Sequence, residues 1–365
     1  MRHRFHALCP YFAMFPESFA EKWIAELSKP GDVVLDPFCG RGTTPFQAVL
    51  MNRRAVGCDT NNVAFCLTKA KTSPPRLSSL MRRLELLEER FDGRSWRNSA
   101  DNLPEFFRFA YARRTLQQLL YLRETLKWTT RKTDCMIAAL AIGSLHGEAD
   151  KSQSYFSNQM PRTISTKPAY SVRFWKTRGL VDPPIRDVFA ILRQRAAFRY
   201  ASPLPEKSAT VIRGDMRRLS WKSTPMPDDI RCVITSPPYF DVTSFEEDQW
   251  LRLWFLGGPA GPTRNRISSD DRHTIEARYW SFIADMWRCL GSILGRSASI
   301  VIRIGSSRIT TDNIERQLTA TAAMSHRHVT LVNAERSAIQ NRQTDTFRPG
   351  SRGCREEIDC YYRMR

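Results

Sequence analysis

The stretch "VVLDPFCGRGTT", residues 33–44, determines how the chain is organised. It opens with an apolar run that fits a fully buried strand, and Asp36-Pro37 ends that run. Gly40 and Gly42 follow in a loop, and the sequence "PFQAVLMNRR" after the loop has the pattern of a helix. A strand, a glycine loop and a helix in this order predict the first part of a βαβ unit.

The sequence on either side completes this unit. Residues 15–32, "FPESFAEKWIAELSKPGD", place apolar side chains at helical spacing and end in Pro-Gly. Residues 55–60, "AVGCDT", fit a second strand that ends in Asp59. Because helices and strands alternate, the N-terminal region predicts a parallel sheet.

The same alternation returns after residue 205. "ATVIRGDM" predicts a strand ending at Asp215, and "DIRCVITSPPY" predicts a strand that two prolines stop at Ser236. Further expected elements are helices at 279–294 and 312–324 and strands at 297–307, 328–336 and 357–364. The predicted fold class is therefore α/β, a doubly wound Rossmann-like sheet with a mostly helical insertion. The expected domains are 1–71, 72–205 and 206–365.

The insertion, residues 72–205, is basic. It holds 23 Lys and Arg against 12 Asp and Glu, a net +11, and helical periodicity at 77–91, 114–128, 135–147 and 185–198. A polar stretch at 148–179 interleaves basic residues with aromatic ones, a mixture that suits phosphate backbones and bases. The alternative is a surface loop whose aromatic side chains dock on the helices. The aromatic residues in question are Tyr155, Phe156, Tyr170, Phe174 and Trp175.

Composition limits the class of partner and the compartment. A net charge of +19 points to an anionic partner such as nucleic acid or a membrane surface, with a generally basic surface as the alternative. No run of 18 apolar residues occurs and no signal peptide is recognisable, so we expect an intracellular protein without a membrane span. The nine cysteines form no C-x-x-C pair, which predicts neither a zinc site nor a disulfide framework.

The glycine loop suits a particular class of ligand. In an open parallel sheet, ligands bind beyond the carboxyl ends of the strands, where Gly40 and Gly42 allow close backbone approach. The loop lacks the G-K-[ST] ending of triphosphate-binding loops. Asp36 and Asp59 would place two carboxylates beside the ligand, which favours a cationic, ribose-bearing molecule over a polyphosphate.

Six segments in this order resemble the S-adenosylmethionine-dependent DNA methyltransferases that modify exocyclic amines: "FPESFAEKWI", "DPFCGRGTT", "GCDTN", "RGDM", "TSPPY" and "REEIDCYYRM". The resemblance covers about 6–71 and 208–365, with Arg41 where serine is common. It implies a methyltransferase sheet and S-adenosylmethionine as cofactor, and no metal. The cofactor-binding residues that it implies are Phe15, Pro16, Asp36, Pro37, Phe38, Gly40, Gly42, Thr43, Thr44, Asp59 and Asp215.

The resemblance assigns catalysis to Ser236, Pro237, Pro238 and Tyr239. The Ser236 hydroxyl and the Pro237 carbonyl would accept hydrogen bonds from the target amine, and Tyr239 would stack on a base extruded from the duplex. Serine in the first position, where many adenine-modifying relatives carry Asp or Asn, favours cytosine N4 as the target. Adenine N6 is the first alternative.

Double-stranded DNA is the expected partner, with the insertion as target-recognition region. A cognate restriction endonuclease is a candidate partner, and the expected location is the cytoplasm of a bacterium or archaeon, or of a phage-infected cell, at the nucleoid. Two other functions stay open: guanine-N2 methylation of RNA, since such enzymes share a similar "DPFCG" loop, and a non-catalytic DNA-binding module. Arg303 and Arg308 are open between a phosphate contact and a solvent-exposed position.

Overall fold

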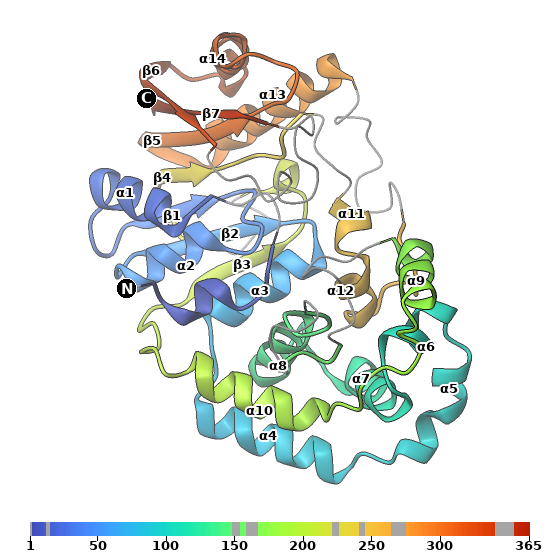
Figure 1. Cartoon of the computed structure of the whole chain (residues 1–365). Coiled ribbons are helices and arrows are strands. Elements are labelled where there is room, and N and C mark those ends of the chain that lie inside the picture. The colour runs from blue at the N-terminus through green and yellow to red at the C-terminus, as the bar shows by residue number, and fades with distance from the viewer. Residues whose placement is uncertain are drawn as a thin grey trace. The chain divides into compact units, whose positions relative to one another are not determined.

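The computed structural model describes residues 2–11, 15–147, 154–157, 167–220, 226–240, 245–263, 275–339 and 354–365. The chain divides into two compact units, which we call the sheet unit and the helical unit (Figure 1). The sheet unit is Met14–Thr68, Pro205–Thr243 and Ile267–Arg365, and the helical unit is Met1–Ala13, Lys69–Leu204 and Ser244–Arg266. The sequence places residues 1–13 and 244–266 with the sheet, whereas in the structure they group with the helices. The expected boundaries at 71/72 and 205/206 stay a prediction about domains.

Seven strands form one sheet in the order β3-β2-β1-β4-β5-β7-β6. The strands are β1 (Val33–Asp36), β2 (Arg54–Asp59), β3 (Ala209–Arg213), β4 (Ile230–Thr235), β5 (Leu294–Gly305), β6 (Val329–Ala338) and β7 (Glu356–Met364). Neighbours from β3 to β5 pair in parallel, and β7 runs antiparallel between β5 and β6. The strand order reverses between β1 and β4, which is the switch point where ligands bind in such sheets. The expected Rossmann-like α/β sheet is therefore confirmed.

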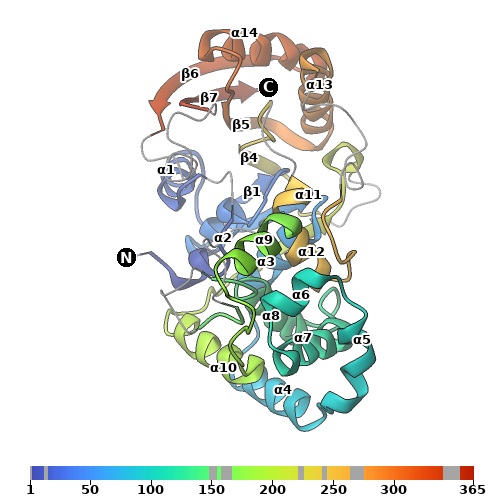
Figure 2. The same ribbon diagram turned by 45° about the vertical axis from the view of Figure 1, so that its right-hand side comes forward.

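Helices cover both faces of this sheet (Figure 2). They are α1 (Glu17–Leu27), α2 (Thr43–Leu50), α3 (Asn62–Thr72), which runs on into the helical unit, α13 (Glu276–Ile293) and α14 (Thr311–Thr321). Side chains alternate along β7, so that Tyr361 contacts Trp23 of α1 while Tyr362 contacts Trp287 of α13. The two helices therefore lie on opposite faces.

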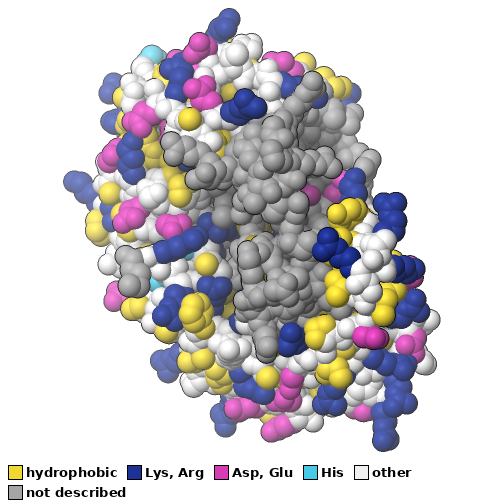
Figure 3. All heavy atoms as spheres, in the orientation of Figure 1, with side chains coloured by type: hydrophobic (Ala, Val, Ile, Leu, Met, Phe, Trp, Pro, Cys, Tyr) yellow, Lys and Arg dark blue, Asp and Glu magenta, His cyan; other side chains and the backbone are white. Residues whose placement is uncertain are grey.

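The helical unit is built from α4 (Leu77–Glu89), α5 (Arg97–Asp101), α6 (Glu105–Ala110), α7 (Arg113–Thr125), α8 (Lys132–Ile142), α9 (Pro168–Thr177), α10 (Val188–Arg199), α11 (Phe245–Asp248) and α12 (Trp250–Phe255). Inside it, the fully buried Asp134 of α8 accepts hydrogen bonds from Arg83 of α4 at 2.8 and 3.2 Å. Lys and Arg side chains project from the visible face of this unit, interspersed with Asp and Glu (Figure 3).

Helix α9 lies inside the polar stretch for which the sequence predicts no helix. Val172 and Trp175 are buried on one side of it, and the Trp175 ring lies 5.4 Å from that of Phe106 in α6. Burial of this short apolar stripe is a tertiary effect that outweighs the polar local composition. Of the aromatic residues there, Phe156 and Trp175 are docked, whereas Tyr170 is 51% exposed.

Within the described ranges, no helix is long and apolar enough to cross a lipid bilayer. Among the same residues, no cluster of three or more His, Cys, Asp or Glu side chains is placed to hold a metal ion.

Candidate functional site

The glycine loop joins β1 to α2 and depends on left-handed backbone. Gly40 and Gly42 have φ angles of 49° and 74°. A Cβ atom on Gly42 would lie 2.4 Å from the hydroxyl oxygen of Thr68, so a side chain there is excluded by contact as well as by conformation. The Arg41 side chain, where serine is common in the family that the sequence resembles, is buried and donates to the Thr43 hydroxyl at 3.3 Å.

Asp36 ends β1 and is completely buried. One carboxylate oxygen accepts from the Thr235 hydroxyl at 2.6 Å and from the Phe38 amide at 3.1 Å. The other oxygen and the buried hydroxyl of Thr44 have no hydrogen-bond partner. Burial raises the pKa of Asp36 to about 7, although these hydrogen bonds favour the ionised form. Asp36 thus ties the end of β1 to the end of β4 and keeps one oxygen unsatisfied.

Asp59 ends β2 and turns back on the glycine loop. Its two carboxylate oxygens accept from the amides of Gly40 and Asn61, each at 2.9 Å. Burial raises its pKa to about 6, against the opposing effect of these backbone hydrogen bonds. The side chain is half-buried and contacts the glycine loop through the Gly40 amide.

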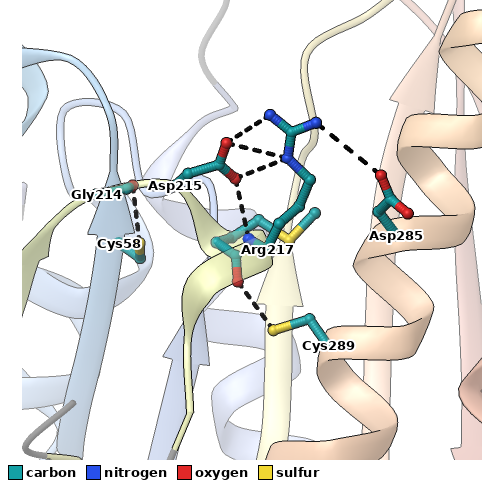
Figure 4. Close-up of polar contacts among 7 residues, drawn as sticks. Cys58, Gly214, Asp215, Arg217, Asp285 and Cys289 are labelled. Atoms are coloured by element: carbon teal, nitrogen blue, oxygen red, sulfur yellow. Dashed lines mark hydrogen bonds and ion pairs between the residues drawn. The ribbon is translucent and has the colours of Figure 1, made fainter. Parts of the chain in front are cut away.

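Asp215 follows β3, and its carboxylate forms an ion pair with the guanidinium of Arg217. Both of its oxygens accept from the Arg217 guanidinium, at distances of 2.5 to 3.0 Å (Figure 4). Arg217 also reaches Asp285 of α13 at 4.0 Å. Nearby, the Phe38 ring of the loop lies 5.4 Å from that of Phe282 on α13. The sequence did not single out Arg217 or Phe282, since an aromatic residue at helical spacing indicates core packing first.

The predicted residues Phe15 and Pro16 precede α1. Pro16 occupies the position before the first helical residue, Glu17, and the Phe15 ring packs edge-on against Phe19 at 4.9 Å. The Phe19 ring of α1 has a second neighbour: the guanidinium of Arg303, on β5, lies 3.9 Å from the centre of that ring.

The corner after β4 is the second half of the site. Ser236, Pro238 and Tyr239 are half-buried, and Pro237 is buried. The Ser236 hydroxyl donates to the Tyr239 hydroxyl at 3.4 Å, and Tyr239 donates to Glu357 of β7 at 2.7 Å. Burial raises the pKa of Tyr239 well above its ordinary value, and the neighbouring Glu357 adds to this.

Strand pairing brings these groups to one edge of the sheet. Leu35 of β1 pairs with Val233 of β4, and Asp59 of β2 pairs with Arg213 of β3, so the strand ends lie side by side. At the end of β5, a Cβ on Gly305 would lie 3.2 Å from the Tyr239 ring. The sequence therefore found the residues that share this edge. Sequence reasoning did not identify Glu357 and Arg303 as partners of the corner. The sequence indicated only that each of these two residues lies on a predicted strand.

Comparisons with known proteins bear on this edge directly. Residues 3–69, which hold α1, the glycine loop and Asp59, match the family model described as DNA methylase. Over this segment the chain is similar to the DNA methylase family. Its sequence is 35% identical over 85 residues to the orphan methyltransferase M.BamHII of Bacillus amyloliquefaciens, covering 23% of this chain and 29% of that protein. It is 38% identical over 61 residues to the type II methyltransferase M.SmaI of Serratia marcescens, covering 17% and 21%.

The matched part of the chain thus spans less than a third of the first relative's length. A solved structure that resembles it is an rRNA methyltransferase, AviRa from Streptomyces viridochromogenes, with a TM-score of 0.32 and 15% identity over 99% of this chain and 93% of that one. A second is described as an rRNA methylase from Clostridium thermocellum, with a TM-score of 0.33 and 8% identity over 97% and 100%.

The similarity to DNA methylases implies S-adenosylmethionine as methyl donor. The residues of the site fit it. The unpartnered oxygens of Asp36 and Thr44 offer hydrogen-bond acceptors, and the glycine loop leaves backbone accessible. Asp59 would supply a carboxylate for ribose hydroxyls.

Proposed function

We propose that the protein transfers a methyl group from S-adenosylmethionine to an exocyclic amine of a base in duplex DNA, at cytosine N4 in preference to adenine N6. The observation that carries this proposal is the 2.6 Å hydrogen bond between Thr235 and Asp36. It joins the residue before the Ser-Pro-Pro-Tyr corner to the first residue of the cofactor loop. A methyl donor held by the loop and an amine held by the corner would therefore be neighbours.

S-adenosylmethionine supplies an electrophilic methyl group when it is bound. The chain's own task is to make a weakly nucleophilic amine attack that group. Acceptors at Ser236 and Pro237 would take hydrogen bonds from the amine and turn the nitrogen lone pair towards the donor, and the two prolines keep those acceptors rigid. The face of Tyr239 would hold the extruded base.

The choice of cytosine rests on Ser236. A serine hydroxyl is shorter than the Asp or Asn side chain of many adenine-modifying relatives. This residue favours N4 of cytosine by resemblance.

Duplex DNA as substrate is supported by the family match and by charge. The segment 72–205, most of the helical unit, carries a net +11, which suits a polyanion. Target recognition by this unit, a cognate restriction endonuclease and a cytoplasmic location in a bacterium, archaeon or phage-infected cell belong to the same proposal.

The test is methyl transfer by the purified full-length protein. Radiolabelled S-adenosylmethionine and mixed-sequence duplex DNA should give labelled DNA, and sequencing that separates N4-methylcytosine from N6-methyladenine should report cytosine in a short context. Transfer to RNA with none to DNA would overturn the substrate, and N6-methyladenine alone would overturn the base.

Two variants separate catalysis from cofactor binding. Ser236→Ala should abolish transfer while calorimetry shows cofactor affinity close to that of the wild type. Asp59→Ala should weaken cofactor binding by about tenfold or more, since it removes a carboxylate hydrogen-bond partner. Full transfer by Ser236→Ala would contradict the role given to the corner.

A further inference from the structure

A one-way chain of hydrogen bonds leads away from the catalytic corner. Tyr239 lies 2.7 Å from a carboxylate oxygen of Glu357, and Ser236 lies 3.4 Å from the Tyr239 hydroxyl. An ionised carboxylate can only accept, so Tyr239 must donate to Glu357. The Tyr239 oxygen then accepts from Ser236, whose single hydroxyl proton points along the chain.

This direction has a consequence for Ser236. A serine hydroxyl has one proton and two lone pairs. With its proton committed to Tyr239, Ser236 presents only lone pairs to an amine. Hydrogen bonds in a chain also polarise one another, so Glu357 strengthens Ser236 as an acceptor.

Glu357 is held in place by charged groups on the same face of the sheet. Arg303 of β5 lies 3.7 Å from its other carboxylate oxygen. Arg303 also makes two hydrogen bonds, of 2.6 and 2.7 Å, to Asp359, and it lies over the Phe19 ring. The side chains of Arg303 and Asp359 are 12% and 8% exposed, whereas that of Glu357 is 20% exposed. The Glu357 carboxylate is thus held by Arg303 on its buried side and remains in contact with solvent on the other.

We propose that Glu357 is the terminal acceptor of the proton that the target amine releases, carried there by the hydroxyls of Ser236 and Tyr239. The inference rests on the proposed methyl transfer. As the nitrogen–methyl bond forms, the bond from the methyl carbon to the donor's sulfur would break and leave its electron pair on sulfur. The amine nitrogen is then cationic and carries one proton in excess. Loss of that proton leaves the N–H electron pair on nitrogen and restores its neutral charge.

The proton balance closes along the three groups. Ser236 takes the amine proton and passes its own hydroxyl proton to Tyr239, which passes its own to Glu357. Both hydroxyls end with one proton each, and the carboxylate becomes a carboxylic acid. Glu357 then returns the proton to water through its exposed edge, which resets the chain.

The decisive comparison is between the ring and the hydroxyl of Tyr239. Tyr239→Phe keeps the face on which a base would stack and removes the relay. Glu357→Gln keeps the size of the side chain and removes the acceptor. Glu356→Gln is the matched control, because Glu356 is the preceding residue of β7 and accepts instead from Thr311 of α14, on the other face.

The experiment measures single-turnover methyl transfer at saturating duplex DNA and S-adenosylmethionine, with KM for both and thermal unfolding of each variant. Tyr239→Phe and Glu357→Gln should each slow transfer by about 100-fold, the lower range for positioned proton transfer, with KM values near those of the wild type. The double variant should be no slower than either single one, because both break the same chain. Glu356→Gln should match the wild type.

Wild-type rates in Tyr239→Phe would overturn the relay and leave the methyltransferase function standing. So would losses that multiply in the double variant, or an equal loss in Glu356→Gln. If Glu357→Gln does not fold, Tyr239→Phe decides alone. A wild-type protein that methylates neither DNA nor RNA overturns the proposed function and the relay together.

Discussion

At the level of single residues, Asp36 serves both the geometry of the site and the pH dependence of folding. It is completely buried and shares one oxygen between Thr235 and the Phe38 amide. Burial raises its pKa to about 7, whereas an aspartate in an unfolded chain titrates near 4. Between these values the folded protein binds the proton and the unfolded chain does not.

This difference predicts how stability changes with pH. Protonation of Asp36 stabilises the folded state. This contribution to the free energy of unfolding is fully present below about pH 4 and is lost as the pH rises through about 7. The loss amounts to about 1.4 kcal/mol for each pH unit between the two pKa values. Asp36→Asn cannot ionise and should gain stability relative to the wild type over that range. Urea unfolding at several pH values measures the gain. Asp32→Asn, at the exposed position just before β1, is the control and should follow the wild type. If the stability of Asp36→Asn ran parallel to that of the wild type at every pH, the role given to Asp36 would be refuted.

Single residues also show where sequence reasoning stops. Asp36, Asp59 and Ser236 were predictable because each ends an apolar strand, and parallel strands bring their carboxyl ends to one edge. Glu357 was not, since it reaches Tyr239 only through the pairing of β7 beside β5. The sequence left undecided whether Arg303 contacts a phosphate or points to solvent. In the structure it donates a hydrogen bond to Asp359 instead.

At the level of elements, α9 is where pattern and structure differ most. The polar stretch around α9 gave no sign of its buried side, because Trp175 packs on Phe106 of α6, about seventy residues earlier in the sequence. The strands before the glycine loop and before the prolines were predicted well, since an apolar run bounded by such residues has few other interpretations.

The other side of α9 presents a ladder that suits nucleic acid. Tyr170 and Phe174 stack at 6.4 Å with ring planes 26° apart, and the Arg178 guanidinium lies 4.4 Å over Phe174. These residues stand four apart, so they share one helix face, and Tyr170 is 51% exposed. Aromatic and guanidinium planes of this kind bind bases and phosphates.

We therefore expect Tyr170→Ala with Arg178→Ala to weaken binding of duplex DNA by about tenfold, since one base or phosphate contact contributes about 1–3 kcal/mol. Fluorescence anisotropy with a labelled duplex measures this. Arg82→Ala, at an exposed position on α4, removes the same charge as Arg178→Ala and should have a smaller effect. Equal losses in the two variants would mean that only charge matters and that the ladder has no special role.

For the whole molecule, the sheet is assembled from three stretches of the chain. β1 and β2 come from residues 14–68, β3 and β4 from residues 205–243, and β5, β6 and β7 from residues 267–365. The sequence predicted that arrangement, because helix and strand patterns alternate before residue 72 and after residue 205, whereas residues 72–205 show only helical patterns. Residues 2–11 could not have been assigned to the helical unit, since that grouping depends on contacts such as that between the rings of Phe5 and Tyr200.

The charge of the whole chain gives a last prediction, which distinguishes the two proposed ligands, DNA and S-adenosylmethionine. A net charge of +19 should make DNA binding fall linearly with salt on logarithmic axes, with a slope of about −0.9 for each phosphate neutralised. S-adenosylmethionine would, on the proposed function, bind at the edge shaped by Asp36, Asp59 and backbone groups. Its affinity should therefore change little between about 50 and 200 mM salt, because it displaces no condensed counterions. Anisotropy for DNA and calorimetry for the cofactor, in the same buffers, test both. A flat salt response for DNA would show that the basic residues make no contact with its phosphates.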